Sequence, residues 1–78
     1  MQSVHRAVRI LGCFTLEHPE LGVTELSREL GLHKSTVSRL LLALRDEGLV
    51  VQSGTGRYRL GARVLGMAAV VLSSLDVV

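Results

Sequence analysis

Residues 23–42 have the sequence VTELSRELGLHKSTVSRLLL, which is the part of the chain that indicates the fold most directly. Apolar side chains recur at helical spacing on both sides of Gly31, which predicts two short helices joined by a tight turn. A helix-turn-helix needs an apolar inner face on its first helix, a small residue at the helix crossing, a flexible turn residue and apolar anchors on its second helix. The residues that meet these demands are Leu26, Ser27, Leu30, Gly31, Leu32, Val37 and Leu40. The stretch therefore predicts a helix-turn-helix, with an ordinary pair of short core helices as the alternative.

The helices around this motif are predicted from periodicity and from residues suited to helix ends. An apolar stripe indicates an amphipathic first helix over residues 3–16, which stops before Pro19. The stripe consists of Val4, Ala7, Val8, Leu11 and Phe14. Thr24 is predicted to cap the second helix through its hydroxyl, and Ser35 and Thr36 suit the start of the third helix.

Downstream of the motif, the sequence changes from helical periodicity to strand alternation. Residues 49–60 contain an apolar strand, a turn rich in Ser and Gly, and a second strand that alternates Arg, Tyr, Arg and Leu. We therefore predict a two-stranded hairpin. Tyr58 and Leu60 are expected on the core side, and Arg57 and Arg59 are expected to face solvent or a ligand.

Residues 63–78 are predicted to form a last helix, which lacks proline and is apolar around most of its circumference. The expected fold is mostly α: a winged helix-turn-helix of three helices and a two-stranded β-hairpin wing, followed by a C-terminal linker helix. Its predicted boundaries are residues 1–61 for the winged domain and residues 62–78 for the linker. Because so apolar a helix needs a partner, we expect it to pair, together with the first helix, with the same elements of a second chain.

Length and composition exclude several classes of protein. The 78 residues suffice for one small domain, and the single Cys13, expected to be a buried inert thiol, excludes an internal disulfide. Cys13 and the histidines lack the spacing of metal ligands, so we expect no metal site. The sequence contains no catalytic pair of residues and no phosphate-binding loop, so we expect no cofactor and no enzyme activity. The longest apolar run, residues 64–72, is about half a membrane span, and residues 1–11 do not resemble a secretion signal, which indicates a cytoplasmic protein.

The net charge of +2 is distributed unevenly along the chain. Residues 28–63 contain seven basic and three acidic residues, whereas residues 1–27 are slightly acidic and residues 64–78 carry only Asp76. Such a concentration is expected of a polyanion-binding face, although charge alone fits an Arg-rich solvated surface equally well. Phe14 and Tyr58 are the only aromatic residues, which argues against RNA or single-stranded nucleic acid held by base stacking.

Three stretches carry a resemblance to a known family: RAVRIL at 6–11, GVTELSRELGLHKSTVSRLLLALRDEGLV at 22–50 and GRYRLGARVLGM at 56–67. They are similar to the N-terminal winged helix-turn-helix domain of the IclR family of bacterial and archaeal transcription regulators. Ser27 stands where Ala is usual at the helix crossing, and His33 where the family often has Pro. The resemblance implies a homodimeric regulator, here expected to be a repressor, on a pseudo-palindromic duplex operator. A small-molecule effector would bind only to a C-terminal domain absent from this chain.

Basic and hydroxyl-bearing side chains of the third helix and the hairpin are the candidate DNA interface. The second helix of such a motif presents its outward side chains to base edges in the major groove, and a hairpin can lie on the backbone or in the minor groove. The candidates are Lys34, Ser35, Thr36, Ser38, Arg39, Arg45, Arg57 and Arg59. Ser35 could instead cap the helix, and Arg39 could contact a phosphate rather than a guanine. The alternative function is a winged helix that binds only proteins. Apolar or acidic outer faces would favour it, whereas the faces here are basic and rich in hydroxyls.

Overall fold

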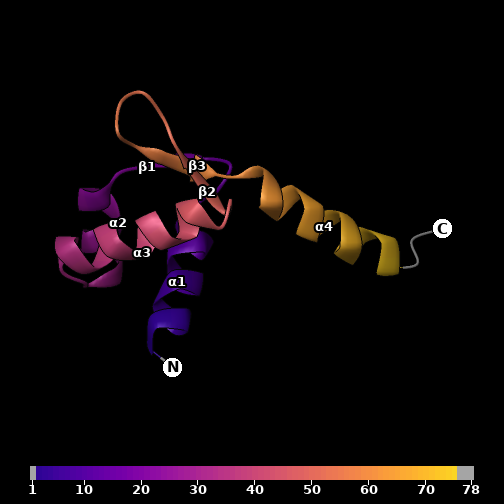
Figure 1. The fold of residues 1–78 in the computed structure, drawn as a ribbon, viewed down its shortest axis with the longest axis horizontal. Helices are drawn as coiled ribbons and strands as arrows, with labels where there is room; N and C mark the ends of the chain where they lie inside the picture. The colour runs from indigo at the N-terminus through magenta and orange to yellow at the C-terminus, as the bar shows by residue number, and fades with distance from the viewer. Residues whose placement is uncertain (1, 76–78) are drawn as a thin grey trace.

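The computed structural model describes residues 2–75, which form four helices and a small antiparallel sheet; the first three helices lie on one side of the sheet (Figure 1). The elements in chain order are α1 (Gln2–Cys13), β1 (Glu20–Leu21), α2 (Val23–Leu30), α3 (Lys34–Asp46), β2 (Val50–Gln52), β3 (Tyr58–Leu60) and α4 (Ala62–Ser74). Strand β3 lies between β1 and β2 and runs antiparallel to both. This arrangement confirms the predicted winged helix-turn-helix fold.

One apolar core lies where α1, α2 and α3 meet the sheet (Figure 1). Its buried side chains are Ile10, Phe14, Leu21, Leu26, Val37, Leu41, Leu44, Val50 and Tyr58. Among the predicted anchors of the motif, Leu26 and Val37 are buried, and Leu30, Leu32 and Leu40 are half-buried against the core. The two helices of the motif therefore use the faces that their periodicity predicts.

The turn between α2 and α3 depends on Gly31 and Ser27. Gly31 has a φ of 67°, in the left-handed region that favours glycine, and its N–H donates to the carbonyl of Ser27 at 2.9 Å. The N–H of Leu32 donates to the same carbonyl at 3.2 Å, and the hydroxyl of Ser27 donates to the carbonyl of Leu32. Ser27 is therefore small enough for the helix crossing, as the more usual Ala would be. Its hydroxyl adds a hydrogen bond across the turn that Ala could not make.

Helix α1 is shorter than predicted, and its apolar residues face two ways. It ends before residue 14 because a turn follows, in which the backbones of Thr15 and His18 exchange hydrogen bonds of 3.1 and 3.2 Å. Ile10, which the predicted stripe omitted, is fully buried, whereas Val4 and Val8 are exposed. The stripe thus combined residues that pack on the core with residues that face outward.

The predicted cap of α2 is wrong. Gly22, not Thr24, is the N-cap residue, and its N–H donates to Oε1 of Glu25 at 2.9 Å. Glu25 is the third residue of the helix, the position from which a carboxylate reaches back to the cap. Thr24 lies exposed in the first turn. Its capping propensity was misleading because the extended backbone that a cap requires occurs two residues earlier.

The wing belongs to a three-stranded sheet rather than to an isolated two-stranded hairpin. Strand β1 pairs with β3, and Glu20 lies opposite Arg59. A strand of two residues is too short to show alternation, so the sequence did not indicate it. Tyr58 is buried as predicted, but Leu60 is 39% exposed, because β3 ends there and the chain leaves the sheet at Gly61.

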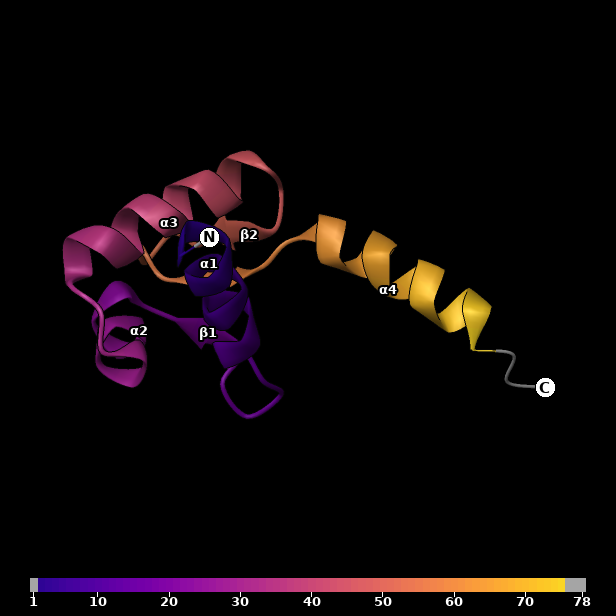
Figure 2. The same ribbon diagram turned by 90° about the horizontal axis from the view of Figure 1, so that it is seen from below.

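Helix α4 projects away from the core as a separate arm (Figure 2). It occupies most of the predicted helix of residues 63–78, of which residues 76–78 lie outside the described part of the chain. None of the residues of α4 is buried. The large apolar side chains exposed on α4 and its C-cap are Leu65, Met67, Val70, Val71, Leu72 and Leu75. An apolar surface of this extent is typical of an interaction site.

Arg63 attaches the first turn of α4 to the turn that follows α3. Its Nη1 donates to the carbonyl of Glu47 at 3.0 Å and lies 2.7 Å from Oε1 of the same residue. The N–H of Arg63 also donates to the carbonyl of Gly48 at 3.3 Å. These bonds join the base of the arm to the winged domain.

Replacing Gly61 with Ala is expected to destabilise this junction. A Cβ at residue 61 would overlap the carbonyl oxygen of Gly48 and lie 3.0 Å from its carbonyl carbon, and backbone atoms cannot move away as a flexible side chain can. Overpacking of this kind costs about 1 to 3 kcal/mol of unfolding free energy, so urea unfolding should have a lower midpoint. Gly66→Ala is the control: within residues 2–75 nothing lies within 4 Å of its Cβ position, and its midpoint should stay equal or rise. Equal midpoints for Gly61→Ala and the unaltered chain would contradict the close approach.

Candidate nucleic-acid interface

Helix α3 has a core face and an outer face, and two of the predicted interface residues lie at the middle of the outer face. At 3.6 residues per turn, the fully buried Val37 and Leu41 define the core side. Ser35 and Arg39 are exposed on the opposite side, one turn apart. Leu42, at 42% exposure, extends the same face by a further turn. Leu42 is absent from the predicted interface residues because an apolar residue in a helix is more often a core residue.

The other predicted residues of α3 lie on its two flanks. Lys34, Ser38 and Arg45 are on the flank toward the hairpin, where Nη1 of Arg45 donates to Oε1 of Gln52 at 3.3 Å. Thr36 is on the opposite flank, next to α1, where it lines a small hollow. The predicted set therefore wraps around the outer half of the helix instead of forming one flat patch.

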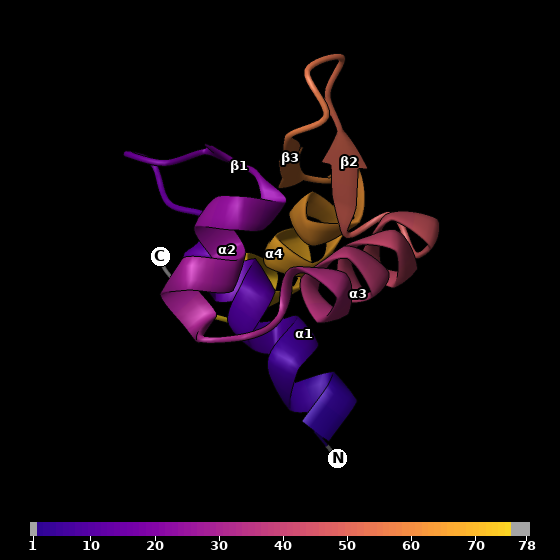
Figure 3. The ribbon, with the colours of Figure 1, turned by 90° about the vertical axis from the view of Figure 1, so that its left-hand side faces the viewer.

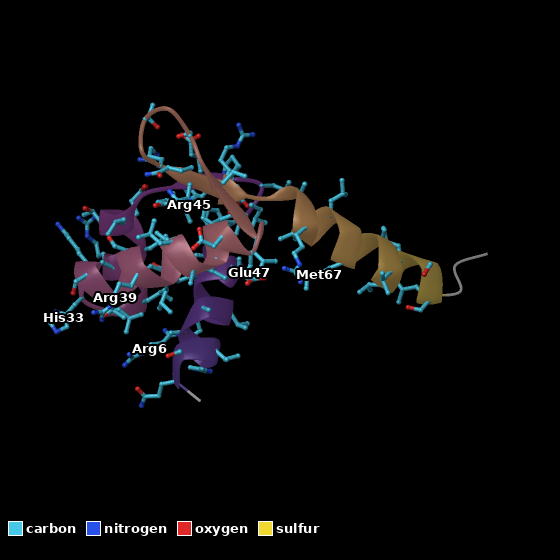
Figure 4. The ribbon with its side chains drawn as sticks, viewed as in Figure 1. Arg6, His33, Arg39, Arg45, Glu47 and Met67 are labelled. Carbon is cyan, nitrogen blue, oxygen red and sulfur yellow. The ribbon has the colours of Figure 1, made fainter. Side chains whose placement is uncertain are left out.

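The N-terminus of α3 has no side-chain cap. His33, which Figure 4 labels at the start of α3, is the N-cap residue. The first hydrogen bond of the helix runs from the N–H of Val37 to the carbonyl of His33, at 3.1 Å. Ser35 lies inside the first turn, so the alternative that it caps the helix is wrong. Uncapped N–H groups and the positive end of the helix dipole together suit a phosphate group.

Arg57 does not extend freely from the wing. Its Nη2 lies 2.7 Å from Oε1 of Glu25 and donates to the carbonyl of Glu20 at 2.9 Å, and its Nε lies 3.6 Å from Oε1 of Glu20. Glu25 also accepts the N–H of Gly22, so the cluster ties the base of the hairpin to β1 and to the start of α2. The side chain of Arg57 is still 42% exposed, so it faces outward as predicted, but its charge is already engaged by two carboxylates. Its partner Glu20 is 37 positions away, a separation at which helix and strand periodicities carry no information.

Arg59 lies in the middle of β3, opposite Glu20 and Val51 in the sheet register. Its side chain is exposed and lines an open hollow of about 420 Å³ beside the loop that follows α1. Phe14 and Leu60 contribute to the same hollow. Arg59 thus faces outward as predicted, on the part of the sheet next to this loop.

Ion pairing divides the basic side chains into two groups. Arg45, Arg57 and Arg63 each lie within 4.0 Å of a carboxylate. Six other basic residues have no carboxylate within 4.0 Å in the described part of the chain: Arg6, Arg9, Arg28, Lys34, Arg39 and Arg59. Lys34, Arg39 and Arg59 therefore offer an unpaired positive charge. The Arg45 pair, at 4.0 Å and partly exposed, is weak enough to yield to a phosphate.

The sequence model of the IclR helix-turn-helix domain matches residues 3–54, which contain α1, α2, α3 and the first strand of the wing. The chain belongs to the IclR family. It is 38% identical over 78 residues to the HTH-type transcriptional regulator XynR of Escherichia coli, covering 99% of this chain and 31% of XynR. Identity to the transcriptional repressor IclR of the same organism is 31% over 75 residues, 95% of this chain and 27% of that protein. The crystal structure of an IclR family transcriptional regulator from Brucella abortus matches with a TM-score of 0.90 at 34% identity, over 97% of this chain and 29% of that one.

These relatives show the general role of the chain. It spans less than a third of the length of the relatives named above, and the matching part is the helix-turn-helix DNA-binding domain of an IclR-family transcriptional regulator. The curated relatives are named as regulators of transcription, not as enzymes. In residues 2–75 of this IclR-family chain, no helix has both the length and the apolar character that crossing a bilayer requires.

Cys13 has the surroundings of a structural thiol. It is half-buried, and its Sγ donates to the carbonyl of Arg9 at 3.3 Å. Burial raises the pKa of the Cys13 thiol, and the nearby negative charge of Glu29 raises it further, against an opposing effect of Arg9. A protonated thiol is a poor nucleophile and a poor metal ligand. Across residues 2–75, no three side chains of the metal-binding types gather into a possible site.

Replacing Arg57 with Ala is expected to weaken the fold without changing the salt dependence of DNA affinity. Loss of its partly exposed ion pairs and of the bond to the Glu20 carbonyl should lower the unfolding free energy by about 1 kcal/mol. Because two carboxylates already neutralise the guanidinium, few counterions should be released through it on binding. Arg59→Ala is the matched control: it removes the same charge from an unpaired side chain, so unfolding should change by less than about 0.5 kcal/mol. A salt slope reduced by about one for Arg57→Ala would instead show a direct phosphate contact.

Proposed function

We propose that this chain binds double-stranded DNA sequence-specifically, with the outer face of α3 in the major groove. The observation that carries the proposal is that Arg39 and Ser35 lie exposed side by side on a helix whose N-terminus has no side-chain cap. Arg39 has no carboxylate within 4.0 Å in residues 2–75. Arg39 can donate two hydrogen bonds to a guanine edge, and the hydroxyls of Ser35 and Ser38 can reach bases or phosphates. Leu42 adds an apolar surface suited to the methyl group of thymine.

The hairpin is proposed to lie on the DNA backbone or in the minor groove beside the site of α3. Its tip is compact: the hydroxyls of Ser53 and Thr55 lie 2.8 Å apart, and Ser53 Oγ donates to the carbonyl of Arg57 at 3.1 Å. The phosphate contacts proposed around α3 and the wing come from Lys34, Arg45 and Arg59. Arg57 acts indirectly in this proposal, since its bonds to β1 and α2 hold the wing in place.

A homodimer assembled through α1 and α4 is part of the same proposal. Apolar residues recur at alternating spacings of three and four on α4 and its C-cap, as in helices that pair with other helices: Leu65, Ala68, Leu72 and Leu75. Val4 and Val8 provide exposed apolar surface on α1. Two copies would present two α3 helices to major grooves about one DNA turn apart, which suits a pseudo-palindromic operator.

Residues 1–61 form the DNA-binding unit in this proposal, and residues 62–78 a linker helix toward an effector domain. The support is that the chain matches under a third of each relative, the rest of which lies outside the match. A small-molecule effector would act through that further domain. By analogy with the relative named transcriptional repressor IclR, the complete regulator would act as a repressor. Since its proposed partner is operator DNA, its proposed location is the cytoplasm, where it would bind the nucleoid.

Selection of bound duplexes from a random pool, at a stated salt concentration, tests the proposal directly. We expect enrichment of one sequence with two related half-sites, and a selected duplex that binds at least about 1,000-fold more tightly than an unrelated one. Enrichment of single half-sites would contradict the dimer. Failure to enrich any sequence, with equal weak binding to all duplexes, would contradict sequence-specific recognition and favour a protein-interaction module.

A further inference from the structure

A hollow of about 270 Å³ lies between the beginning of α1 and the flank of α3. Ser3 and Arg6 of α1 line it on one side, and Thr36, Arg39 and Leu40 of α3 on the other. The lining thus contains two guanidinium groups, two hydroxyl groups and one apolar side chain. Figure 4 shows Arg6 and Arg39 on the same side of the molecule, below α3 in that view.

The two arginines of this hollow have no acidic partner in the described part of the chain. Neither Arg6 nor Arg39 has a carboxylate within 4.0 Å, unlike the arginine at the base of the wing. Two unpaired guanidinium groups that line one small hollow repel each other, and a bound anion removes this repulsion. The hollow also lies beside the first turn of α3, whose uncapped N-terminus adds positive potential. Its electrostatics therefore favour an anion.

The hollow and the wing lie on opposite sides of α3. Figures 1 and 3, which view the molecule from directions 90° apart, both show the hairpin on one side of α3 and the N-terminal end of α1 on the other. A helix in the major groove has a phosphate backbone along each rim, about 12 Å apart. If the wing lies along one rim of the groove, the beginning of α1 therefore lies beside the opposite rim.

We propose that the Arg6 hollow binds a DNA phosphate on the groove rim opposite the wing. The inference rests on the proposed binding of α3 in the major groove and adds α1 to the interface. Arg6 and Thr36 contact the phosphate oxygens, and Ser3 adds a hydroxyl donor at the edge. Arg39 stands at the boundary between this phosphate site and the base-reading face, so its guanidinium is held between a phosphate on one side and the groove floor on the other.

The sequence contains only a faint sign of this site. Arg6 lies four residues before the buried Ile10, so it is close to the core face of α1 and is partly buried there, whereas Arg9 points away and is exposed. Periodicity thus distinguishes the two arginines of α1 but does not identify α3 as the neighbour of Arg6. The two arginines form a matched pair for an experiment, because they carry the same charge on the same helix and only Arg6 lines the hollow.

The test compares Arg6→Ala with Arg9→Ala in the 78-residue chain, on a selected duplex and on an unrelated duplex, across a salt series. For Arg6→Ala we expect about tenfold weaker binding on both duplexes, as for loss of a charge-assisted hydrogen bond. The salt slope should also be smaller in magnitude by about 0.9, the value for one lost phosphate contact. Arg9→Ala should bind like the unaltered chain. Arg6→Lys should recover the salt slope and part of the affinity, because it keeps the charge but loses the planar fork.

A chemical change in the DNA identifies the phosphate. Single neutral methylphosphonates are placed one at a time along each strand of the selected duplex. One position, on the rim away from the wing, should weaken the unaltered chain about tenfold and should not weaken Arg6→Ala any further. Equal binding of Arg6→Ala and Arg9→Ala on every duplex would overturn the phosphate site while Arg39→Ala still tests the major-groove contact. Additive losses at all positions would overturn it as well, and absence of binding by the unaltered chain would overturn the proposed function with it.

Discussion

If the proposed dimer forms, substituting Leu65 and Leu72 together with Gln is expected to convert it into a monomer and to weaken operator binding about 100-fold or more. Two linked recognition helices bind with an effective concentration that raises affinity by factors of 10² to 10⁴, and this gain disappears when the copies separate. Both side chains are largely exposed, and α4 contributes no buried residue to the core. The double substitution should therefore leave the winged domain folded.

Sedimentation equilibrium and titrations with whole operators and single half-sites measure this effect. The monomeric variant should bind a half-site as tightly as the unaltered chain does and should lose affinity only for the whole operator. Met67→Gln with Val70→Gln is the control, because it makes an equal polar change on the other side of the same helix. If both double variants remained dimeric, or both became monomeric, the stripe of residues at spacings of three and four would not be the contact.

The helix-turn-helix could be predicted because each of its determinants is local. Leu26 and Val37 are buried at the spacing of their helices, and Gly31 adopts the left-handed conformation that its position after a helix indicates. The same rules failed at the start of α2, because the competing caps Gly22 and Thr24 are only two residues apart. Local rules thus identify an element more reliably than its first residue.

The electrostatics of the candidate site could not be predicted, because they depend on pairs that are distant in sequence. Arg57 and Arg59 look equivalent in the alternation of the hairpin, yet Arg57 is held by Glu20 and Glu25 and Arg59 has no carboxylate within 4.0 Å in residues 2–75. Conversely, Arg6 belongs to a helix whose presence the sequence predicts, but only the packing of α1 on α3 brings it to the same hollow as Arg39. A net charge along the chain therefore indicates a polyanion partner without showing which arginines are available to it.

Replacing Arg39 with Ala is expected to weaken binding to the selected operator by about 1 to 3 kcal/mol, the range for loss of a bidentate contact between arginine and guanine. Arg39 is at the middle of the outer face of α3, and it has no carboxylate within 4.0 Å in the described part of the chain. If it binds a guanine, the loss should be much smaller on a duplex in which that base pair is substituted. If it contacts only a phosphate, the loss should be equal on both duplexes and the salt slope should fall by about one.

Arg28→Ala is the control for this measurement, because Arg28 is an exposed arginine of the other helix of the motif and has no carboxylate within 4.0 Å in residues 2–75. It removes the same charge, so the general electrostatic effect of one missing arginine can be subtracted from the effect of Arg39→Ala. A loss for Arg39→Ala that exceeds this control only on the selected operator assigns base recognition to Arg39. A loss of affinity no larger than that of Arg28→Ala on either duplex would show that Arg39 is not part of the interface. Base recognition would then fall to Ser35, Ser38 and Leu42. Because their side chains are shorter, α3 would have to lie deeper in the groove.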